Sequence, residues 1–169
     1  MESTRFTADV ADKIAIMEQI YRYCRSVDRL DVPLGHSVFH EKSYVDYGPG
    51  VYKGDGRGVI DYICQAHSEF LSHSHQVSNI LIDIDGDRAG SEAYVTATLR
   101  TGDPARPREI RVYGRYIDSW SRREEKWGID RRDVVIDFDS VSEVSPVQTE
   151  VRGTRDQSDP SYQVFLHRP

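Results

Sequence analysis

The hydrophobic pattern of this chain changes its period near residue 73, and this change constrains the fold more than any other feature. Before it, apolar residues recur every three or four positions, which is typical of amphipathic helices. From residue 73 onward, apolar and polar residues alternate, which is typical of half-buried strands. The sequence therefore predicts helices first and an antiparallel sheet after them.

Helical spacing predicts two elements at the start of the chain. A cap at Thr7 or Asp9 would begin a helix that continues to about Arg29. Val32-Pro33 would end this helix, because proline has no backbone N–H to donate. A short helical turn over residues 34–40 is expected next.

A short hairpin is predicted before the third helix. Residues 44–47 alternate like a strand, Gly48-Pro49-Gly50 turns the chain, and residues 51–53 form the partner strand. The glycines of residues 54–58 lack the lysine–serine ending of a phosphate-binding loop, so we expect them to start a helix. Apolar residues keep helical spacing from there to Phe70.

A four-stranded antiparallel meander is predicted from the alternating part of the chain. Asp85-Gly86-Asp87 and the polar cluster at 122–126 are its tight turns, and residues 101–107, with two prolines and a glycine, form a longer loop. The predicted strands cover residues 73–84, 89–100, 108–119 and 126–138.

The order of elements predicts one domain over residues 9–140, between a loose leader over residues 1–8 and a C-terminal tail over residues 141–169. The fold class is α+β, in which a cone-shaped, curved mixed or antiparallel sheet packs on three N-terminal helices. Such a layer arrangement leaves an internal pocket between sheet and helices, and a ligand site is expected there.

Composition argues against several classes of function. A formal charge of −6 and a pI near 5.5 argue against a nucleic-acid partner. No run approaches the ~20 apolar residues of a membrane span, and no signal peptide is visible. Cys24 and Cys64 fall within helical patterns and are expected to be reduced core residues, which suits a cytoplasmic protein.

A charged residue, Asp28, falls on the expected apolar face of the first helix. A carboxylate on a core-facing surface needs a partner, because burying it alone is costly. Candidate partners are His73, His75 and the Arg131-Arg132 pair. The apolar stripe, from which one four-residue step reaches the aspartate, consists of Val10, Ile14, Met17, Tyr21 and Cys24.

The strand that begins at residue 73 has histidines on one face. If this face lies inside the cone, an imidazole is the best general base available at neutral pH, and Asp28 would orient it. The alternative is that either histidine lies at a strand end and bonds a backbone carbonyl. Alternation does not decide which face is inside. The histidine face consists of His73, His75, Val77, Asn79 and Leu81.

The last predicted strand places Arg132 among apolar residues at alternate positions. An arginine in such surroundings needs an anionic partner, and it could stabilise charge on a leaving group or an oxyanion. The alternative is a structural ion pair with Asp28, Asp46 or Asp137.

No metal or other cofactor is predicted. His36 and His40 could share one helical face, but they have no clear third ligand. His73 and His75 could form a metal-binding trio with Asp28, but no further carboxylate or cysteine lies near them in the sequence.

Six short motifs follow one another in an order that indicates a family. They are Ile20-Tyr21, Ser26-Val27-Asp28-Arg29, Tyr52-Lys53-Gly54, His75-x-x-x-Asn79, Asp85-Gly86-Asp87 and Trp127-x-Ile129-x-x-Arg132. Over residues 9–140 the chain resembles the SnoaL-like branch of the nuclear-transport-factor-2-like cone fold. Within that branch it is most similar to hexachlorocyclohexane dehydrochlorinases, bile-acid dehydratases and scytalone dehydratase.

The resemblance implies which residues act. The dehydrochlorinase has an Asp–His dyad and an arginine in these motifs, and they correspond to Asp28, His75 and Arg132. The bile-acid dehydratase has a catalytic tyrosine five residues before its aspartate, and Tyr23 has that spacing. The substrate-binding residues expected on the pocket wall are Tyr21, His73, Tyr47 and Asn79.

The sequence thus predicts a cofactor-independent lyase, of the dehydratase or dehydrohalogenase type, that acts on a small apolar cyclic substrate. An isomerase or polyketide cyclase is an alternative in the same pocket, because it needs the same base and oxyanion stabiliser. A non-catalytic ligand-binding protein or a small partner subunit of a ring-hydroxylating oxygenase is another alternative. The resemblance also implies a homo-oligomer, either a dimer or a trimer.

Overall fold

The structure of the chain is a computed structural model that describes residues 2–149 and 153–165, with the backbone only for residues 2–8. In this part of the chain, three helices and a six-stranded sheet confirm the predicted α+β class. The elements are α1 (Glu2–Arg29), α2 (Val32–Val38), β1 (Phe39–Asp46), β2 (Lys53–Gly54), α3 (Gly56–Ser68), β3 (Ser72–Asp85), β4 (Arg88–Asp103), β5 (Arg106–Arg123), β6 (Lys126–Glu143) and the 3₁₀ turn η1 (Pro160–Gln163).

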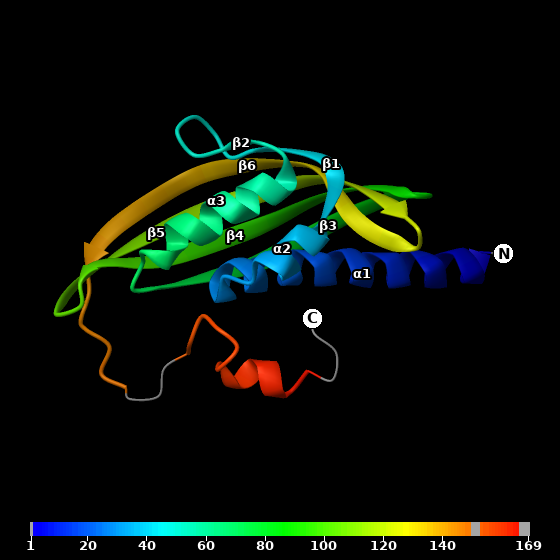
Figure 1. Ribbon diagram of the computed structural model, residues 1–169. Helices are drawn as coiled ribbons and strands as arrows, with labels where there is room; N and C mark the ends of the chain where they lie inside the picture. Colours follow the sequence, from blue (N-terminus) through cyan, green and yellow to red (C-terminus); the bar gives the residue numbers. More distant parts are fainter. Residues whose placement is uncertain (1, 150–152, 166–169) are drawn as a thin grey trace.

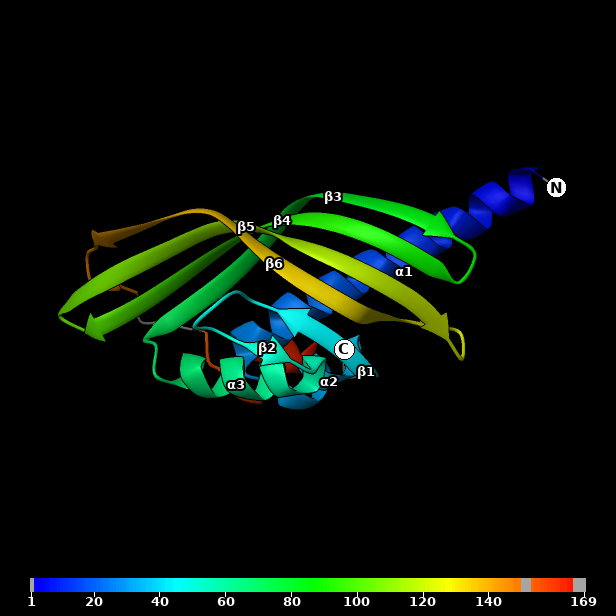
Figure 2. The same cartoon turned by 90° about the horizontal axis from the view of Figure 1, so that it is seen from above.

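The sheet is mixed, curved and open. Its strand order is β2-β1-β6-β5-β4-β3, and neighbouring strands are antiparallel except β1 and β6, which are parallel. The meander β3–β6 therefore forms as predicted, and the short hairpin β1–β2 extends the sheet beside its last strand. All three helices lie on one side of the sheet (Figures 1 and 2), so the core and the cavity lie between the two layers.

Helix α1 is longer than the sequence predicted. It begins at Glu2, so the segment expected as a loose leader is helical, and neither Thr7 nor Asp9 is the cap. Residues 2–29 contain no glycine or proline, so nothing in the sequence stops the helix earlier. Among the described residues, no helix is long and apolar enough to cross a membrane.

The end of α1 agrees with the prediction. The helix ends at Arg29, and Leu30 takes the left-handed conformation that often follows a helix, with φ at 54°. Pro33 also belongs to the start of α2, where Asp31 is the cap and its Oδ1 accepts a hydrogen bond from the Leu34 N–H at 3.2 Å.

The buried face of α1 differs from the expected stripe. Val10, Ile14 and Tyr21 are exposed, so most of that stripe faces solvent. The observed face is one residue away from it, which corresponds to a rotation of about 100° around the helix. Asp28 consequently lies at the edge of the buried face, where its side chain is 15% exposed. The buried residues of the helix include Ile16, Ile20, Tyr23, Cys24 and Val27.

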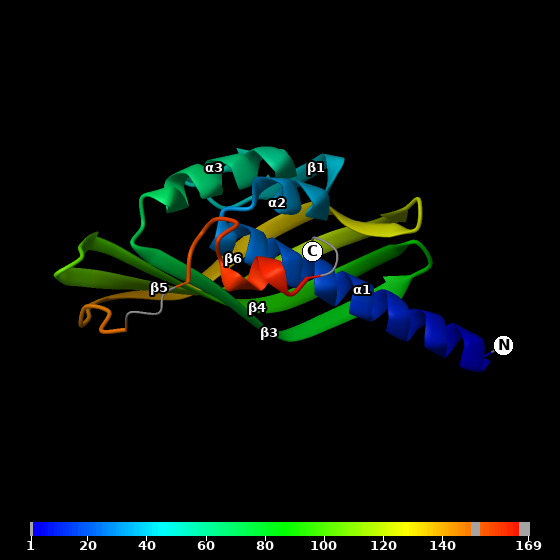
Figure 3. The same ribbon diagram turned by 60° about the horizontal axis from the view of Figure 1, so that its bottom comes forward.

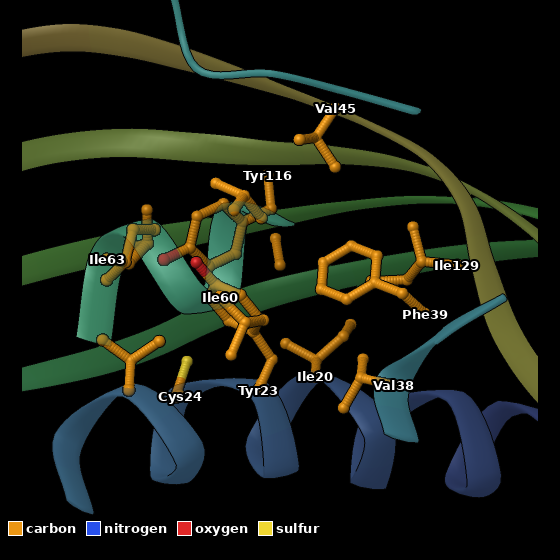
Figure 4. Packing of buried hydrophobic residues seen from close by; sticks show 14 of the residues in the cluster. Ile20, Tyr23, Cys24, Val38, Phe39, Val45, Ile60, Ile63, Tyr116 and Ile129 are labelled. Carbon is orange, nitrogen blue, oxygen red and sulfur yellow. The ribbon is translucent and has the colours of Figure 1, made fainter. Parts of the chain in front are cut away.

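Aromatic rings form the centre of the core. Tyr23 points from α1 into the space between the layers, where its ring meets the rings of Tyr116 and Phe39 edge-on (Figure 4). The centroid distances are 5.4 Å to Tyr116 and 6.1 Å to Phe39. Each such pair contributes about 0.5–1.5 kcal/mol beyond the burial of apolar area. This packing fixes the position of α1 against the sheet.

A bulge in β3 changes which of its side chains face inward. The pairing register with β4 shifts between Ser78 and Leu81, and Asn79 adopts a left-handed φ of 49°. The face that carries the histidines therefore does not stay inward along the whole strand, because Asn79 is exposed and Leu81 is 69% exposed. The residues of β3 that pack toward the core on the two sides of the bulge are Val77, Ile80, Ile82 and Ile84.

The connection between β4 and β5 is tighter than expected. β4 continues to Asp103 and β5 begins at Arg106, so only Pro104 and Ala105 make the turn. The Asp103 carboxylate accepts a hydrogen bond from the Ala105 N–H at 2.8 Å. A side chain thus stabilises a two-residue turn where the two prolines suggested a longer loop.

The C-terminal tail contacts its own chain over residues 153–165. These residues lie beside the end of α1 in two views (Figures 1 and 3). Arg25 donates to the Ser161 hydroxyl at 3.2 Å, and the Tyr162 hydroxyl donates to Asp31 at 3.0 Å. The tail therefore packs on the part of α1 that contains the candidate dyad residue.

Candidate active site

Asp28 and His75, the two residues that the sequence predicted as a dyad, are hydrogen-bonded to each other. The distance between His75 Nδ1 and Asp28 Oδ1 is 2.8 Å. The same carboxylate accepts the backbone N–H of His75 at 3.0 and 3.1 Å. The side chain of His75 is 8% exposed and that of Asp28 is 15% exposed, so the pair is largely shielded from water. Helix α1 and strand β3 are thereby joined at the site.

The hydrogen bond to Asp28 selects the tautomer of His75. A carboxylate can only accept, so in the neutral ring Nδ1 is the nitrogen that carries the proton and Nε2 is the one with the lone pair. His75 lines the internal cavity, and Nε2 is the ring nitrogen left for a ligand there. A ring held in one orientation, with a carboxylate behind it, is the arrangement that general bases use.

An apolar cavity of about 350 Å³ lies between the helices and the sheet. Its size falls within the range of small-molecule sites, which begins at about 300 Å³. Its lining side chains come from α1, the β1–β2 connection, α3, the α3–β3 connection and four strands of the sheet. They are Tyr23, Tyr47, Val51, Tyr62, Ile63, Ala66, His67, Phe70, His75, Val95, Ala97, Leu99, Val112, Tyr116, Val134 and Ile136.

Two tyrosine hydroxyls meet at the cavity wall. Tyr23 and Tyr47 are 2.7 Å apart, oxygen to oxygen, and either one can be the donor. Burial raises the pKa of Tyr23 well above its ordinary value, Tyr47 adds to this rise, and the positive charge of Arg132 opposes it. Burial also raises the pKa of Tyr47, again against the charge of Arg132. Both phenols are therefore hydrogen-bond donors at neutral pH.

Arg132 is not among the side chains that line the cavity; it lies behind the rings of Tyr23 and Tyr116. It is fully buried and forms a two-point ion pair with Asp118, at 2.8 and 2.7 Å. Its guanidinium lies 4.2 Å from the ring centroid of Tyr23 and 4.1 Å from that of Tyr116. The arginine acts on the cavity wall through these two rings and through Tyr47, whose rise in pKa its charge and hydrogen bonding oppose.

The partner of Arg132 is none of the three that the sequence suggested. Asp28 pairs with His75, Asp46 with Lys53, and Asp137 with Arg115. Asp118 lies directly opposite Arg132 in the pairing of β5 with β6. Removing one partner of a buried pair leaves an uncompensated charge, which typically costs about 3–5 kcal/mol. The ion pair of Arg132 with Asp118 is therefore expected to stabilise the fold.

His73 bonds a backbone carbonyl, which is the alternative that the sequence left open for either histidine. Its Nε2 donates to the backbone carbonyl of Val27 at 2.8 Å, near the end of α1. Its Nδ1 is buried with no hydrogen-bond partner among the described residues. Burial lowers the pKa of His73, which keeps the ring neutral. It is not among the residues that line the cavity.

A third histidine, His67, belongs to the site and was not predicted. Its ring stacks on that of His75 with centroids 5.8 Å apart, and it lies 4.8 Å from the ring of His73. Burial lowers the pKa of His67 to about 3, and the neighbouring histidines add to the effect. His67 lies three residues before Phe70 and four after Ile63 in the helical pattern, and this spacing was the only signal in the sequence.

Besides His73, two more predicted substrate-binding residues lie outside the cavity. Tyr21 is 47% exposed and borders an outer groove of about 420 Å³, which also reaches Asp28 and His75. Asn79 is exposed at the bulge of β3. Tyr47, by contrast, lines the cavity as predicted. The helix rotation explains the position of Tyr21, and the bulge explains that of Asn79.

The candidate metal ligands have other partners. His36 pairs with Asp61 at 2.9 Å, and His40 Nε2 bonds the Ser121 carbonyl at 2.9 Å. Within residues 2–149 and 153–165, no group of three or more His, Cys, Asp or Glu side chains is arranged to hold a metal ion.

A larger hollow of about 710 Å³ lies between the β4–β5 hairpin and the tail. Its described lining includes Arg100 but no histidine, tyrosine or carboxylate. Size alone would favour this hollow, but the groups able to move protons line the smaller cavity. The candidate active site is therefore the apolar cavity of about 350 Å³ between the helices and the sheet.

The fold and this cavity define a class of small α+β cone proteins with an apolar cavity between helices and sheet. The SnoaL-like domain family matches residues 8–133 of the chain. The chain therefore belongs to the SnoaL-like domain family, and the resemblance carried by the sequence motifs is confirmed.

Solved structures share the fold at low sequence identity. A protein of Novosphingobium aromaticivorans provisionally named scytalone dehydratase is 23% identical, with a TM-score of 0.68 over 86% of this chain and 99% of that one. A hexachlorocyclohexane dehydrochlorinase of Novosphingobium barchaimii is 15% identical, with a TM-score of 0.68 over 85% and 97%. A Novosphingobium aromaticivorans protein provisionally named aromatic ring hydroxylase is 25% identical, with a TM-score of 0.69 over 80% and 94%.

Proposed function

We propose that this chain is a cofactor-independent lyase that removes water or a hydrogen halide from a small, mostly apolar cyclic substrate. The observation that carries the proposal is the Asp28–His75 pair, with 2.8 Å between Nδ1 and the carboxylate, at the wall of an apolar cavity. Family neighbours that are named as a dehydratase and a dehydrochlorinase support the same reaction class.

In this proposal His75 is the general base. Its Nε2 accepts a proton from a substrate carbon, and the electron pair of the broken C–H bond becomes the new C=C bond. The neighbouring C–O or C–halogen bond breaks, and the departing group leaves as water, after protonation, or as halide. Asp28 stabilises the imidazolium that forms on His75 and holds its ring in place.

The departing group, or a carbonyl that activates the C–H bond, would lie against the hydroxyls of Tyr23 and Tyr47. One of the two hydroxyls donates to the other, so one proton is left to donate to the substrate. Arg132 is a positioning residue in this scheme. Its charge beside the ring of Tyr23 favours hydrogen-bond donation by the phenol and would stabilise negative charge that develops on the substrate oxygen.

The proposal places the reaction in the cytoplasm. Cys24 and Cys64 are buried free thiols, which supports a reducing compartment.

A partner subunit of a ring-hydroxylating oxygenase is the second candidate. The 25% identity to a protein provisionally named aromatic ring hydroxylase favours it. In this role the dyad would be structural, so replacing His75 would leave activity of an oxygenase complex unchanged, and the chain alone would eliminate nothing.

The test is an elimination screen with cyclic alcohols and cyclic halides, in which product alkene is detected by mass spectrometry. For a substrate that is turned over, His75→Ala should lower kcat/KM by about 10²–10⁴-fold, because a general base typically contributes that much. Asp28→Asn should lower kcat while the protein stays folded by circular dichroism. His36→Ala, which changes an exposed histidine on α2, is the matched control.

Two results would overturn the lyase. One is a His75→Ala variant with the wild-type rate, and the other is the absence of any elimination across the screen. A substrate labelled with deuterium at the acidic carbon distinguishes the isomerase alternative, because an isomerase returns the label to its product without losing a group.

A further inference from the structure

Exposure divides the lining of the apolar cavity into a closed end and an open end. Tyr23 and Tyr116 line it and are 1% and 4% exposed, so they lie at the closed end. Three other large apolar side chains line the same cavity although solvent reaches them. Their exposed fractions are 49% for Val51, 42% for Tyr62 and 52% for Ile136. A side chain that lines a cavity and also faces solvent lies at its mouth, so these three are the mouth residues.

Three different elements bring the mouth residues around one opening. β1 and β6 are parallel and paired as far as Asp46 and Asp133, so the connection that follows β1 continues beside the next residues of β6. Val51 lies in this connection, and Ile136 follows Asp133 in β6. Tyr62 comes from α3, which contacts both β1 and β6. The topology of the sheet therefore places the mouth between the β1–β2 connection, α3 and β6.

The β1–β2 connection projects from the body of the molecule beside α3 (Figure 1). Gly48 and Gly50 have left-handed φ values of 86° and 84°, and no described atom lies within 4 Å of the position that a Cβ would take at either residue. The ring of Tyr62, by contrast, packs against that of Tyr52, with the centroids 5.7 Å apart. One side of the mouth is therefore an uncrowded turn, and another is a supported aromatic ring.

The mouth residues form a small apolar surface that continues the lining of the cavity. Exposed apolar patches often mark a binding site. A protein partner fits this surface poorly, because a stable interface takes about 20–30 residues a side. A single ligand, by contrast, can contact the closed end and the mouth together, since the same cavity connects them.

We propose that the mouth residues bind an uncharged alkyl chain of the substrate, while the cyclic part of the substrate lies in the cavity. The cavity of about 350 Å³ is near the lower end of the range for small-molecule sites, so a ring system that fills it leaves a chain to extend outward. The described lining has no lysine, arginine or carboxylate, which suits a chain without charges along its length. This inference deepens the proposed function, and it rests on the same cavity as the substrate site.

Two ligands that differ only in chain length test the inference without requiring turnover. They are 6-ethyl-2-naphthol and 6-hexyl-2-naphthol, and the fluorescence of the naphthol reports their binding. A fully buried methylene changes affinity by about fourfold, so each of the four added methylenes should contribute about twofold at a half-exposed mouth. We therefore expect the wild-type chain to bind the hexyl ligand about 10–20-fold more tightly than the ethyl ligand.

A double variant removes the aliphatic part of the mouth. Val51→Ser combined with Ile136→Ser should reduce the advantage of the hexyl ligand to about threefold, because Tyr62 remains, and should leave the dissociation constant of the ethyl ligand nearly unchanged. The matched control is Val10→Ser combined with Leu81→Ser. It changes two exposed aliphatic side chains that do not line the cavity, so it should keep the full advantage.

A charged chain end tests where the chain leads. A 6-hexyl-2-naphthol whose chain ends in a trimethylammonium group should bind nearly as tightly as the uncharged hexyl ligand, because the chain end would reach water through the mouth. If the chain were enclosed in the protein instead, binding would be lost, since burying an unpaired charge is very costly.

The inference fails if the wild-type chain binds the two alkyl ligands equally or binds neither. It also fails if the mouth variant keeps the full advantage, if the control variant loses it, or if the charged chain end abolishes binding. A lower molar mass of the mouth variant in light scattering would assign the mouth residues to a contact between copies of the chain.

Failure of this inference is distinguishable from failure of the lyase. A chain that prefers the hexyl ligand through its mouth residues but eliminates nothing in the screen contradicts the lyase alone. Elimination that depends on His75, with no preference for the longer chain, contradicts only the role of the mouth residues.

Discussion

The imidazole rings of His67, His73 and His75 lie close together, but each ring has different neighbours. His75 faces a carboxylate, His73 faces a backbone carbonyl, and His67 faces the cavity and the other two rings. Burial lowers the pKa of both His73 and His67, and the Val27 carbonyl and Asp28 oppose this change for His73 but not for His67.

The low pKa of His67 predicts a loss of stability in mild acid. Its folded pKa of about 3 lies below the unfolded value of about 6.5, so the unfolded chain binds the extra proton first. The contribution of His67 to the free energy of unfolding is complete well above pH 6.5 and is lost progressively as the pH is lowered toward 3. At pH 5 the contribution of this residue amounts to a loss on the order of 2 kcal/mol.

Urea unfolding at pH 7.5 and pH 5 checks this prediction by comparing the wild-type chain with His67→Phe. The variant should lose less stability between the two pH values, since phenylalanine has no proton to bind. Groups that are shared by both proteins cancel in the comparison. Equal pH dependence of the two chains would contradict the assignment.

At the scale of the strands, a bulge decides which residue lies opposite Arg132. Counting back from the β5–β6 turn would place Ile117 opposite Arg132. The pairing register shifts between Ser119 and Trp120, so Asp118 takes that place instead and its carboxylate faces inward. A one-residue shift thereby creates the buried ion pair behind the cavity.

A second register shift, between Tyr113 and Gly114, predicts that a methyl group added at Gly114 lowers the stability of the protein. At Gly114, where β5 passes the bulge of β6, an added Cβ would contact the backbone oxygen of Val135. A backbone atom cannot move away as a side chain can, so Gly114→Ala should destabilise the protein by about 1–3 kcal/mol. Urea unfolding with Gly90→Ala as the control measures this, because a Cβ at Gly90 meets nothing within 4 Å.

The prediction for Gly114 is contradicted if the two alanine variants are equally stable. A smaller effect at Gly90 is expected even though both glycines lie inside long central strands. The difference isolates the close approach at the bulge from the general preference of strands for residues other than glycine.

At the scale of the whole molecule, the two faces of the sheet are unequal. The helices cover one face (Figure 2), and the other face carries apolar side chains in the open. Phe138 on this face is 61% exposed and stacks on Tyr113 with centroids 4.5 Å apart. Further exposed apolar residues on it are Leu81, Tyr94 and Val135. Exposed apolar patches of this kind often mark contact surfaces.

We propose that a second copy of the chain covers this outer face, giving a dimer or a trimer. Light scattering during size exclusion should give a multiple of the 19.4 kDa chain mass. Phe138→Glu should shift the mass toward the monomer, because it puts a charge into the contact. Ile14→Glu, at an exposed position of α1, should not. A monomeric wild-type chain, or an unchanged mass for Phe138→Glu, contradicts the proposal.

The sequence by itself determined the order of helices and strands and the meander, because these follow from local periodicity, which depends only on which neighbours are apolar. The pairing of Asp28 with His75 was predicted from the family resemblance, since the spacing alone left His73, His75 and the Arg131-Arg132 pair as candidate partners. Tertiary structure alone decided which face of α1 is buried, where the strands bulge, and how Asp118 meets Arg132. Those outcomes depend on the competition of whole surfaces for the core, and a one-residue change of rotation or register reverses them without altering the local pattern. His67 belongs to this second group, because only the packing of α3 over β3 brings its ring to the dyad.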